Sequence, residues 1–145
     1  MNADMYKIFF KIQKKHWWFV TKKKIVLDMI SRYQNKTSNI KVLDIGCGSG
    51  LMLNALESIG QAYGMDMSDE AIGFSKEIFT GVVEKEVLPD QMPYQENFFD
   101  LIIARDVIEH VDRDIDSLIM LYSRRVDDGK AIIIVPKNEA GAIDV

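Results

Sequence analysis

The sequence contains a single cysteine, Cys47, among its 145 residues, so no disulfide can form within the chain. A lone cysteine is compatible with a reducing compartment. No apolar run approaches the 18 or so residues that a membrane-spanning helix needs. The lysine-rich segment 1–15 also lacks the small-residue cleavage site of a signal peptide. We therefore expect a cytoplasmic protein without a membrane span.

Histidine is also scarce, since His16 and His110 are the only two. The sequence shows no Ser-His-Asp arrangement and no cluster of metal ligands, so we expect no metal site. It contains no internal repeat and no low-complexity stretch.

The net charge of −4 is unevenly distributed along the chain. Residues 1–41 carry ten Lys or Arg and two Asp or Glu, a balance of +8, whereas the remainder has a balance of −12. An acidic body is a poor partner for a phosphate backbone, so nucleic acid is not expected as a substrate. The basic N-terminal region could bind nucleic acid or an anionic membrane surface, but we favour the simpler interpretation of a solvated helix face.

The stretch from Val42 to Gly50 organises the rest of the sequence. A short apolar strand over 41–45 runs into a loop with glycine at every second position, and a helical pattern follows, carried by Met52, Ala55, Leu56 and Ile59. Glycine is needed where φ is positive or where the backbone approaches a ligand closely. Strand, glycine turn and helix together predict the start of a nucleotide-binding βαβ unit.

The glycine spacing and one carboxylate indicate which nucleotide is bound. The glycines stand at Gly46, Gly48 and Gly50, not in the G-x-G-x-x-G spacing of dinucleotide sites. Asp44 would repel a pyrophosphate but could accept a hydrogen bond from an ammonium group. The segment, with Cys47 as a small loop residue, resembles motif I of the class I S-adenosylmethionine-dependent methyltransferases. The alternative is a tight strand-to-helix turn without a ligand.

A second carboxylate follows the next predicted strand, over 61–65. Asp66 lies twenty residues after Gly46, a separation that brings the end of the neighbouring parallel strand beside the loop. There it can accept both ribose hydroxyls, with Met67 next to it in the cofactor site. A role for Asp66 as a helix cap is the alternative, although Ser68 already supplies a cap.

The N-terminal region carries an aromatic cluster between two predicted helices. A helix over 2–15 has Met5, Ile8, Phe9 and Ile12 on one face, and His16-Trp17-Trp18-Phe19 follows it. This cluster resembles the N-terminal region of type 11 methyltransferases. The resemblance implies that Trp18 covers the cofactor and that Lys22 reaches its carboxylate, although relatives usually have arginine there. The alternative is that the aromatic residues only pack the helices onto the sheet.

Further site candidates come from the second half of the chain. Residues 88–94 resemble the loop in which an acidic residue recognises adenine, and Asp90 is the nearest acid. Phe98 to Val111 resembles the family's FD-hydrophobic run with its Glu-His element. Arg105 ends that predicted strand, beside the crevice where such sheets bind ligands. His110 is the candidate general base for an acceptor hydroxyl or amine, with a structural histidine as the alternative.

These elements predict an α/β protein with a Rossmann-like, doubly wound parallel sheet of five strands in the order 3-2-1-4-5. A helix is predicted over 114–126, where Ile115, Leu118, Ile119 and Tyr122 recur at helical spacing, and a turn at Asp127-Asp128-Gly129 precedes the fifth strand, over 131–135. We place an N-terminal helical cap in 1–39 and the cofactor-binding domain in 40–145. The sequence stops short of the final helix and strands of the family, so a homo-oligomer, another partner or the rest of a longer protein would cover the fifth strand.

The resemblance implies S-adenosylmethionine as cofactor and methyl transfer as activity. The sequence lacks the Asn-Pro-Pro-Tyr element with which amino-methylating DNA enzymes hold a base, having Arg105-Asp106-Val107-Ile108 instead. We therefore expect a small-molecule, lipid or glycan acceptor. Two alternatives stay open: a cofactor-binding module without activity of its own, and an NAD-binding oxidoreductase domain, which the glycine spacing and Asp44 disfavour.

Overall fold

The computed structural model describes residues 3–34 and 39–135, without the side chains of Ala3, Tyr6, Gln13, Lys14 and Trp18. Helices α1 (Ala3–Lys15) and α2 (Trp17–Tyr33) come before the sheet. The later elements are, in chain order, β1 (Ile40–Ile45), α3 (Leu51–Leu56), β2 (Gly60–Asp66), α4 (Asp69–Ile78), β3 (Val82–Lys85), β4 (Phe99–Arg105), the 3-10 turn η1 (Ile108–His110), α5 (Asp114–Arg124) and β5 (Arg125–Ile134).

The five strands form one sheet in the order β3-β2-β1-β4-β5, and every pairing is parallel. This confirms the predicted fold class and strand order. The chain moves outward from β1 in one direction through β2 and β3, then in the other through β4 and β5. In such sheets the carboxyl ends of the two central strands border a crevice in which ligands bind. Here those strands are β1 and β4.

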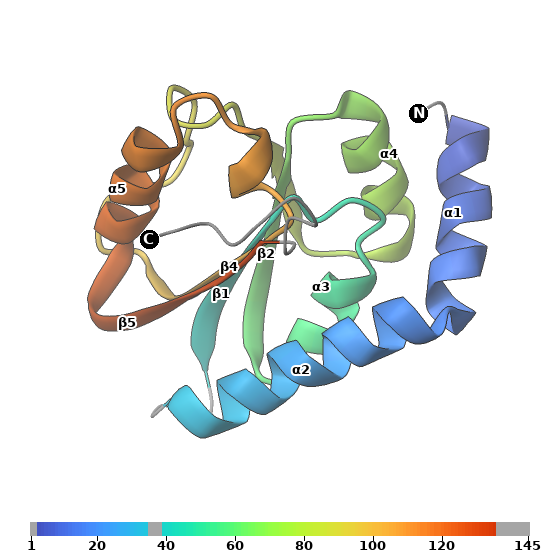
Figure 1. The fold of residues 1–145 in the computed structure, drawn as a ribbon, viewed down its shortest axis with the longest axis horizontal. Coiled ribbons are helices and arrows are strands. Elements are labelled where there is room, and N and C mark those ends of the chain that lie inside the picture. The colour runs from blue at the N-terminus through green and yellow to red at the C-terminus, as the bar shows by residue number, and fades with distance from the viewer. Residues whose placement is uncertain (1–2, 35–38, 136–145) are drawn as a thin grey trace, which may run out of the picture.

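Helices cover both faces of the sheet (Figure 1), which explains why its central strands are apolar along almost their whole length. Val42 of β1 packs in one core cluster with Val26 of α2 and Leu53 of α3. Its neighbour Leu43 points to the other face, where it shares a cluster with Leu121 of α5. Both faces are therefore buried, and the polar groups of the site lie at the strand ends.

An aromatic cluster closes the second face where the chain passes from β3 to β4. The rings of Tyr63, Tyr94, Phe98 and Phe99 lie 4.9–5.6 Å apart between centroids, mostly edge to face. Such pairs add to the stability that burial alone provides. The cluster anchors the loop whose earlier part borders the site described below.

A bulge inside β5 contains the turn predicted at Asp127-Asp128-Gly129. Phe99 of β4 pairs with Arg125, but Leu101 pairs with Lys130, so the intervening residues of β5 loop out of the ladder. The prediction that this strand begins only after the turn is therefore wrong. The parallel ladder with β4 already begins at Arg125, before the turn. Because β5 starts there, α5 ends at Arg124.

The apolar residues whose spacing predicts α5 are mostly exposed. Ile115, Ile119 and Tyr122 are 64%, 63% and 66% exposed, whereas Ser117 and Leu121 are buried. The small Ser117 side chain, whose hydroxyl donates to the Arg113 carbonyl at 2.9 Å, lies on the packed side.

Within residues 3–34 and 39–135, no helix has the length and apolar character needed to cross a membrane.

Candidate functional site

The glycine loop after β1 depends on backbone conformations that other residues rarely adopt. Gly46, Gly48 and Gly50 have φ values of 70°, 54° and 83°. A β-carbon on Gly46 would lie 2.5 Å from Cγ2 of Val107, so a side chain there would collide with the segment after β4. The loop therefore keeps its backbone close to the carboxyl ends of β1 and β4.

Asp66, at the end of β2, holds this loop through its carboxylate. One oxygen accepts a hydrogen bond from the backbone N–H of Gly48 at 2.9 Å, and the other accepts from the N–H of Ser68 at 2.9 Å. The hydroxyl of Ser68 in turn accepts from the N–H of Ala71 and caps α4. Ser68 is thus the helix cap, and Asp66 positions the loop.

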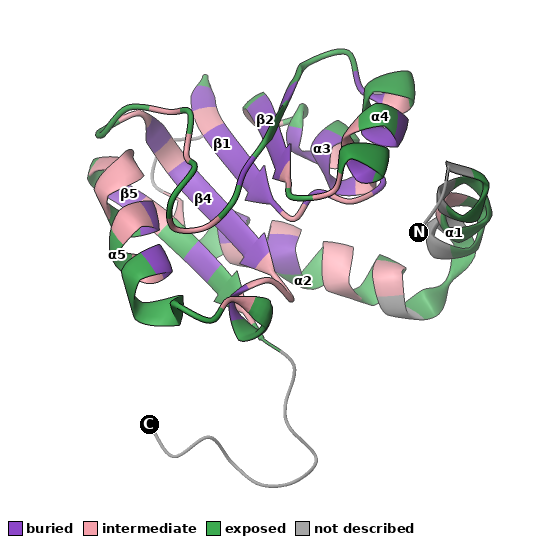
Figure 2. Ribbon diagram, turned by 90° about the horizontal axis from the view of Figure 1, so that it is seen from above, coloured by how far each residue is buried: buried purple, intermediate pink, exposed green. Residues whose placement is uncertain are grey.

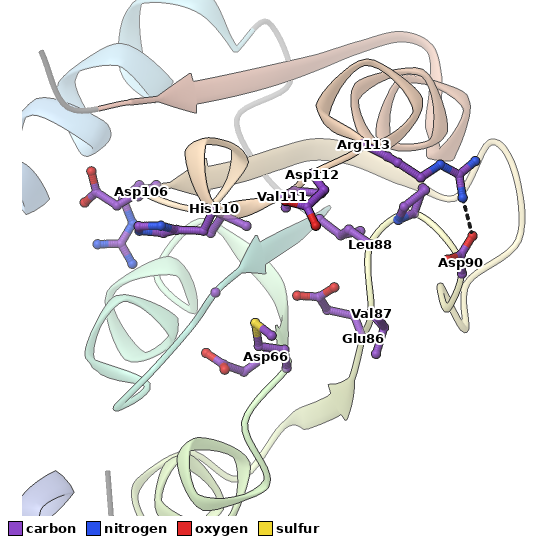
Figure 3. Close-up of a pocket in the computed structure, with 15 residues that line it drawn as sticks. Asp66, Glu86, Val87, Leu88, Asp90, Asp106, His110, Val111, Asp112 and Arg113 are labelled. Atoms are coloured by element: carbon purple, nitrogen blue, oxygen red, sulfur yellow. Dashed lines mark hydrogen bonds and ion pairs between the residues drawn. The ribbon is translucent and has the colours of Figure 1, made fainter. Parts of the chain in front are cut away.

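A cavity of about 480 Å³, which we call the main cavity, opens along this edge of the sheet. Gly46, Asp66 and Met67 form part of its wall, together with residues from the loop after β3 and from the segment after β4. In Figure 3, Asp66 and Glu86 lie on one side of the cavity, and Asp106 and His110 lie on the other. The volume suits a small molecule.

Acidic side chains outnumber basic ones in the wall of the main cavity. Among the residues that the structure describes, Arg105 and Arg113 are the lining residues with a permanent positive charge. Five carboxylates line the same space, those of Asp66, Glu86, Asp90, Asp106 and Asp112. The excess of negative charge favours a cationic ligand over a pyrophosphate.

Glu86 is a site residue that our sequence interpretation missed. It follows β3 directly, just as Asp66 ends β2, so its position after a parallel strand was the signal that could have identified it. It is buried, and its backbone N–H donates to the Asp66 carbonyl at 3.1 Å. Burial and the charge of Asp66 raise the pKa of Glu86 to about 6, while a hydrogen bond with the Leu88 backbone opposes the shift.

Asp44 and Arg105 form an ion pair beneath the loop. Nη2 of Arg105 lies 3.2 Å from Oδ2 of Asp44, which is fully buried. Burial raises the pKa of Asp44, and the neighbouring guanidinium opposes that shift. Arg105 lines the main cavity but Asp44 does not. The predicted contact between Asp44 and a ligand ammonium therefore stays a prediction.

The N-terminal helices reach the site through a second ion pair. Nζ of Lys22 in α2 lies 2.5 Å from Oδ2 of Asp106, the residue after β4. Asp106 has a φ of 55°, and its N–H donates to the Ile134 carbonyl at 2.8 Å.

Trp17 is 67% exposed, which contradicts its suggested packing role, and the side chain of Trp18 lies outside the described residues.

The remaining candidates differ in their surroundings. Asp90 lines the main cavity, and its Oδ1 accepts a hydrogen bond from Nη1 of Arg113 at 2.9 Å. His110 lines the cavity from η1 with an exposed side chain, and its Nε2 lies 3.6 Å from the Glu109 carboxylate. Cys47 is buried, and burial raises the pKa of its thiol, which therefore stays protonated at neutral pH.

Comparison with known proteins assigns the chain to a family. The family model described as "Methyltransferase domain" matches residues 19–143. The chain is 31% identical over 128 residues to a ubiquinone biosynthesis O-methyltransferase of Pelagibacter ubique, covering 81% of this chain and 51% of that protein. A mitochondrial protein with the same function in its name, from Schizosaccharomyces pombe, is 28% identical over 118 residues, covering 72% and 40%. The chain thus spans about half the length, or less, of these relatives.

Solved structures share the fold at lower identity. A structure titled as a putative S-adenosyl-L-methionine-dependent methyltransferase from Methanococcus maripaludis superposes with a TM-score of 0.78 at 18% identity, covering 91% of this chain and 63% of that one. Phosphoethanolamine N-methyltransferase 2 of Haemonchus contortus, in complex with S-adenosyl-L-methionine, gives a TM-score of 0.64 at 23% identity, covering 74% and 26%.

Proposed function

This chain belongs to the class I S-adenosylmethionine-dependent methyltransferases, and on that premise we propose that it transfers the methyl group of S-adenosylmethionine to a hydroxyl group of a small-molecule acceptor. The cofactor lies in the main cavity in this proposal, along the carboxyl ends of β1, β2 and β4. The observation that carries the proposal is the hydrogen bond from Gly48 to Asp66 within an acidic cavity.

That hydrogen bond distinguishes this loop from a phosphate-binding loop. In a dinucleotide site the loop N–H groups face the pyrophosphate, whereas here the N–H of Gly48 donates to a carboxylate. A pyrophosphate on this loop would lie beside the negative charge of Asp66. S-adenosylmethionine carries a sulfonium and an ammonium group besides one carboxylate, and the acidic lining of the main cavity favours this net positive charge over a pyrophosphate.

The nucleoside end of the cofactor is assigned to Asp66, Met67, Glu86 and Asp90. A carboxylate has about four lone-pair sites, so Asp66 can accept ribose hydroxyls in addition to its two backbone donors. Glu86, with its raised pKa, titrates close to neutral pH and can serve as donor or acceptor for an adenine edge. Asp90 can contact the adenine edge only if its carboxylate breaks the ion pair with Arg113.

The amino-acid end is assigned to the opposite wall. The Oδ1 of Asp44 and the Nε of Arg105 are buried and have no hydrogen-bond partner among the described residues. A ligand with one ammonium and one carboxylate group can supply the partners that these two atoms need. The backbone of Gly46, Cys47, Gly48 and Gly50 borders this end, and Lys22 and Trp18 are the proposed contributions of the N-terminal helices.

When bound, the cofactor supplies a methyl group that its sulfonium already activates. The protein must align the acceptor oxygen within about 3–3.5 Å of the methyl carbon and exclude water. His110 lines the cavity and is the proposed base that takes the hydroxyl proton. The O-methyltransferase names of the two sequence relatives support oxygen as the acceptor atom.

A transfer assay with methyl-labelled S-adenosylmethionine tests this function. The acceptors are a panel of phenols, aliphatic alcohols, lipids and sugars, with denatured protein as the blank. We expect label transfer to at least one phenol or alcohol. Tight cofactor binding without transfer to any member would instead support a binding module that lacks activity of its own.

A further inference from the structure

A second cavity, of about 470 Å³, lies among the helices α1, α2 and α3. It shares no lining residue with the main cavity. In Figure 1, α2 crosses below α3, and α1 rises from the N-terminal end of α2. We call the space between these three helices the helix cavity.

Most of the wall of the helix cavity is apolar, and the core holds it in place. Leu27 of α2 and Ala55 of α3 line the cavity and pack against the core cluster on that face of the sheet. Phe10 of α1 also lines it and lies edge to face on Phe74 of α4, with ring centroids 5.5 Å apart. This contact ties down α1, which stands at the edge of the molecule (Figure 2). The apolar surface is therefore already formed, and a ligand that buries it gains free energy.

The charges in the wall are all positive. Lys23 and Lys24, consecutive residues of α2, line the helix cavity, and no acidic residue is found among its described lining. Within residues 3–34 and 39–135, neither lysine forms an ion pair, whereas the preceding Lys22 pairs with Asp106. The main cavity, by contrast, is lined by five carboxylates. The two cavities therefore favour ligands of opposite charge.

Few other polar groups are available to a ligand in the helix cavity. Asn54 is the remaining polar side chain of the described lining, and its amide nitrogen already donates to the Ile78 carbonyl at 3.4 Å. A sugar or a nucleotide would leave most of its polar groups without partners here, which is unfavourable. The wall instead matches a molecule with one anionic group and an otherwise apolar body.

We propose that the helix cavity binds a fatty carboxylate, a molecule with one carboxylate on an unbranched alkyl chain. The ammonium groups of Lys23 and Lys24 hold the carboxylate, and the alkyl chain lies against Phe10, Phe19 and Leu27. Lysine stems can lie along apolar surface while their ammonium groups stay in water, so each part of the ligand meets a matching part of the wall. The volume lies within the range of about 300–1,000 Å³ typical of small-molecule pockets.

Calorimetric titration with octanoate, at concentrations at which it is monomeric, tests the proposal, and 1-octanol is the matched neutral probe. We expect 1-octanol to bind at least about tenfold more weakly than octanoate, because a hydroxyl group gains less from two ammonium groups than a carboxylate does. Across hexanoate, heptanoate and octanoate, the affinity should rise roughly threefold to fourfold for each added methylene group that the apolar wall buries.

Two double variants separate this site from general electrostatic attraction. Lys23→Gln/Lys24→Gln removes the proposed partners of the carboxylate. Lys7→Gln/Lys11→Gln removes the same charge from α1, at exposed residues that do not line the helix cavity. We expect the first variant to lose at least about tenfold in octanoate affinity and the second to bind like the wild type, with circular dichroism as the check that both are folded.

Saturation with S-adenosylhomocysteine should leave octanoate binding unchanged, because the two cavities share no lining residue. Displacement of octanoate by S-adenosylhomocysteine would place the carboxylate in the main cavity and overturn the proposal. Equal octanoate affinity in the two double variants, equal binding of 1-octanol, or no binding of octanoate to the wild type would each overturn it as well. Binding of phosphatidylglycerol vesicles through Lys23 and Lys24 without binding of octanoate would assign the two lysines to a membrane surface instead.

Discussion

The guanidinium of Arg105 and the carboxylate of Asp44 meet 3.2 Å apart beneath the glycine loop, from the ends of two adjacent parallel strands. Asp44 is fully buried, and the Arg105 side chain is only 12% exposed. The pair joins the end of β4 to the end of β1, beneath the loop. The ion pair also fixes the position of the Arg105 side chain in the wall of the main cavity.

Removing Arg105 should therefore destabilise the fold. In Arg105→Met the buried carboxyl of Asp44 has no cation, and breaking a buried pair in this way costs about 3–5 kcal/mol. Because burial holds the pKa of Asp44 above its ordinary value, the loss should be larger at pH 7 than at pH 4, where the carboxyl is more often protonated. Urea denaturation at both pH values measures it, and equal stability of variant and wild type would refute the structural role of the pair.

Gly46→Ala should damage the loop, whereas Gly73→Ala should not. The β-carbon at Gly46 would meet Val107 at 2.5 Å and the backbone φ is 70°, but at Gly73, inside α4, nothing lies within 4 Å of the added carbon. We expect Gly46→Ala to lose at least about tenfold in affinity for S-adenosylhomocysteine, through displacement of the loop backbone. Gly73→Ala should gain roughly 0.5–1 kcal/mol in stability from helix propensity. Calorimetry and thermal unfolding of both variants measure these changes, and a Gly46→Ala protein that binds normally would contradict the loop geometry.

Glu86→Gln should change the pH dependence of stability. A folded-state pKa of about 6, raised from 4.5, means that the native protein binds more protons than the unfolded chain between these values. The free energy of unfolding therefore falls as the pH rises through this window, by up to about 2 kcal/mol from this group. The variant lacks this dependence and should exceed the wild type in stability at pH 7 but not at pH 4. Parallel pH profiles for the two proteins would contradict the raised pKa.

His110→Ala should affect catalysis without affecting cofactor binding. If His110 takes the acceptor proton, kcat at neutral pH should fall by about 10²–10⁴-fold, while the affinity for S-adenosylhomocysteine stays unchanged. Added imidazole should restore part of the rate, since it can enter beside an exposed residue. A variant that keeps full activity, or that loses cofactor binding as well, would remove His110 from the role of general base.

The topology could be predicted from the sequence because local signals agree with the global fold. The near-continuous apolar character of 101–104 indicates a parallel strand covered on both faces, and the alternate glycines indicate where the first strand ends. Asp66 could be identified because the twenty residues between Gly46 and Asp66 are the usual sequence separation between the ends of two consecutive strands in a βαβ unit. The same reasoning applied to the end of β3 would have identified Glu86.

Features that depend on three-dimensional packing could not be predicted in this way. Arg105 and Asp44 are 61 positions apart, and their contact requires the register between β4 and β1. The contact between Lys22 and Asp106 requires, in addition, the placement of α2. The exposed Ile119 on α5 shows that apolar spacing locates a helix but does not say which face meets the sheet.

The central claim is that the carboxylates at the ends of the strands select a nucleoside that carries an amino-acid group over one that carries a pyrophosphate. Its most direct test is calorimetric titration of the wild type and Asp66→Ala with S-adenosylhomocysteine and, separately, with NADH. We predict that the wild type binds S-adenosylhomocysteine and not NADH, and that Asp66→Ala loses about 1–3 kcal/mol of that binding free energy, the usual contribution of hydrogen bonds to a charged group. Binding of NADH without binding of S-adenosylhomocysteine would contradict the account.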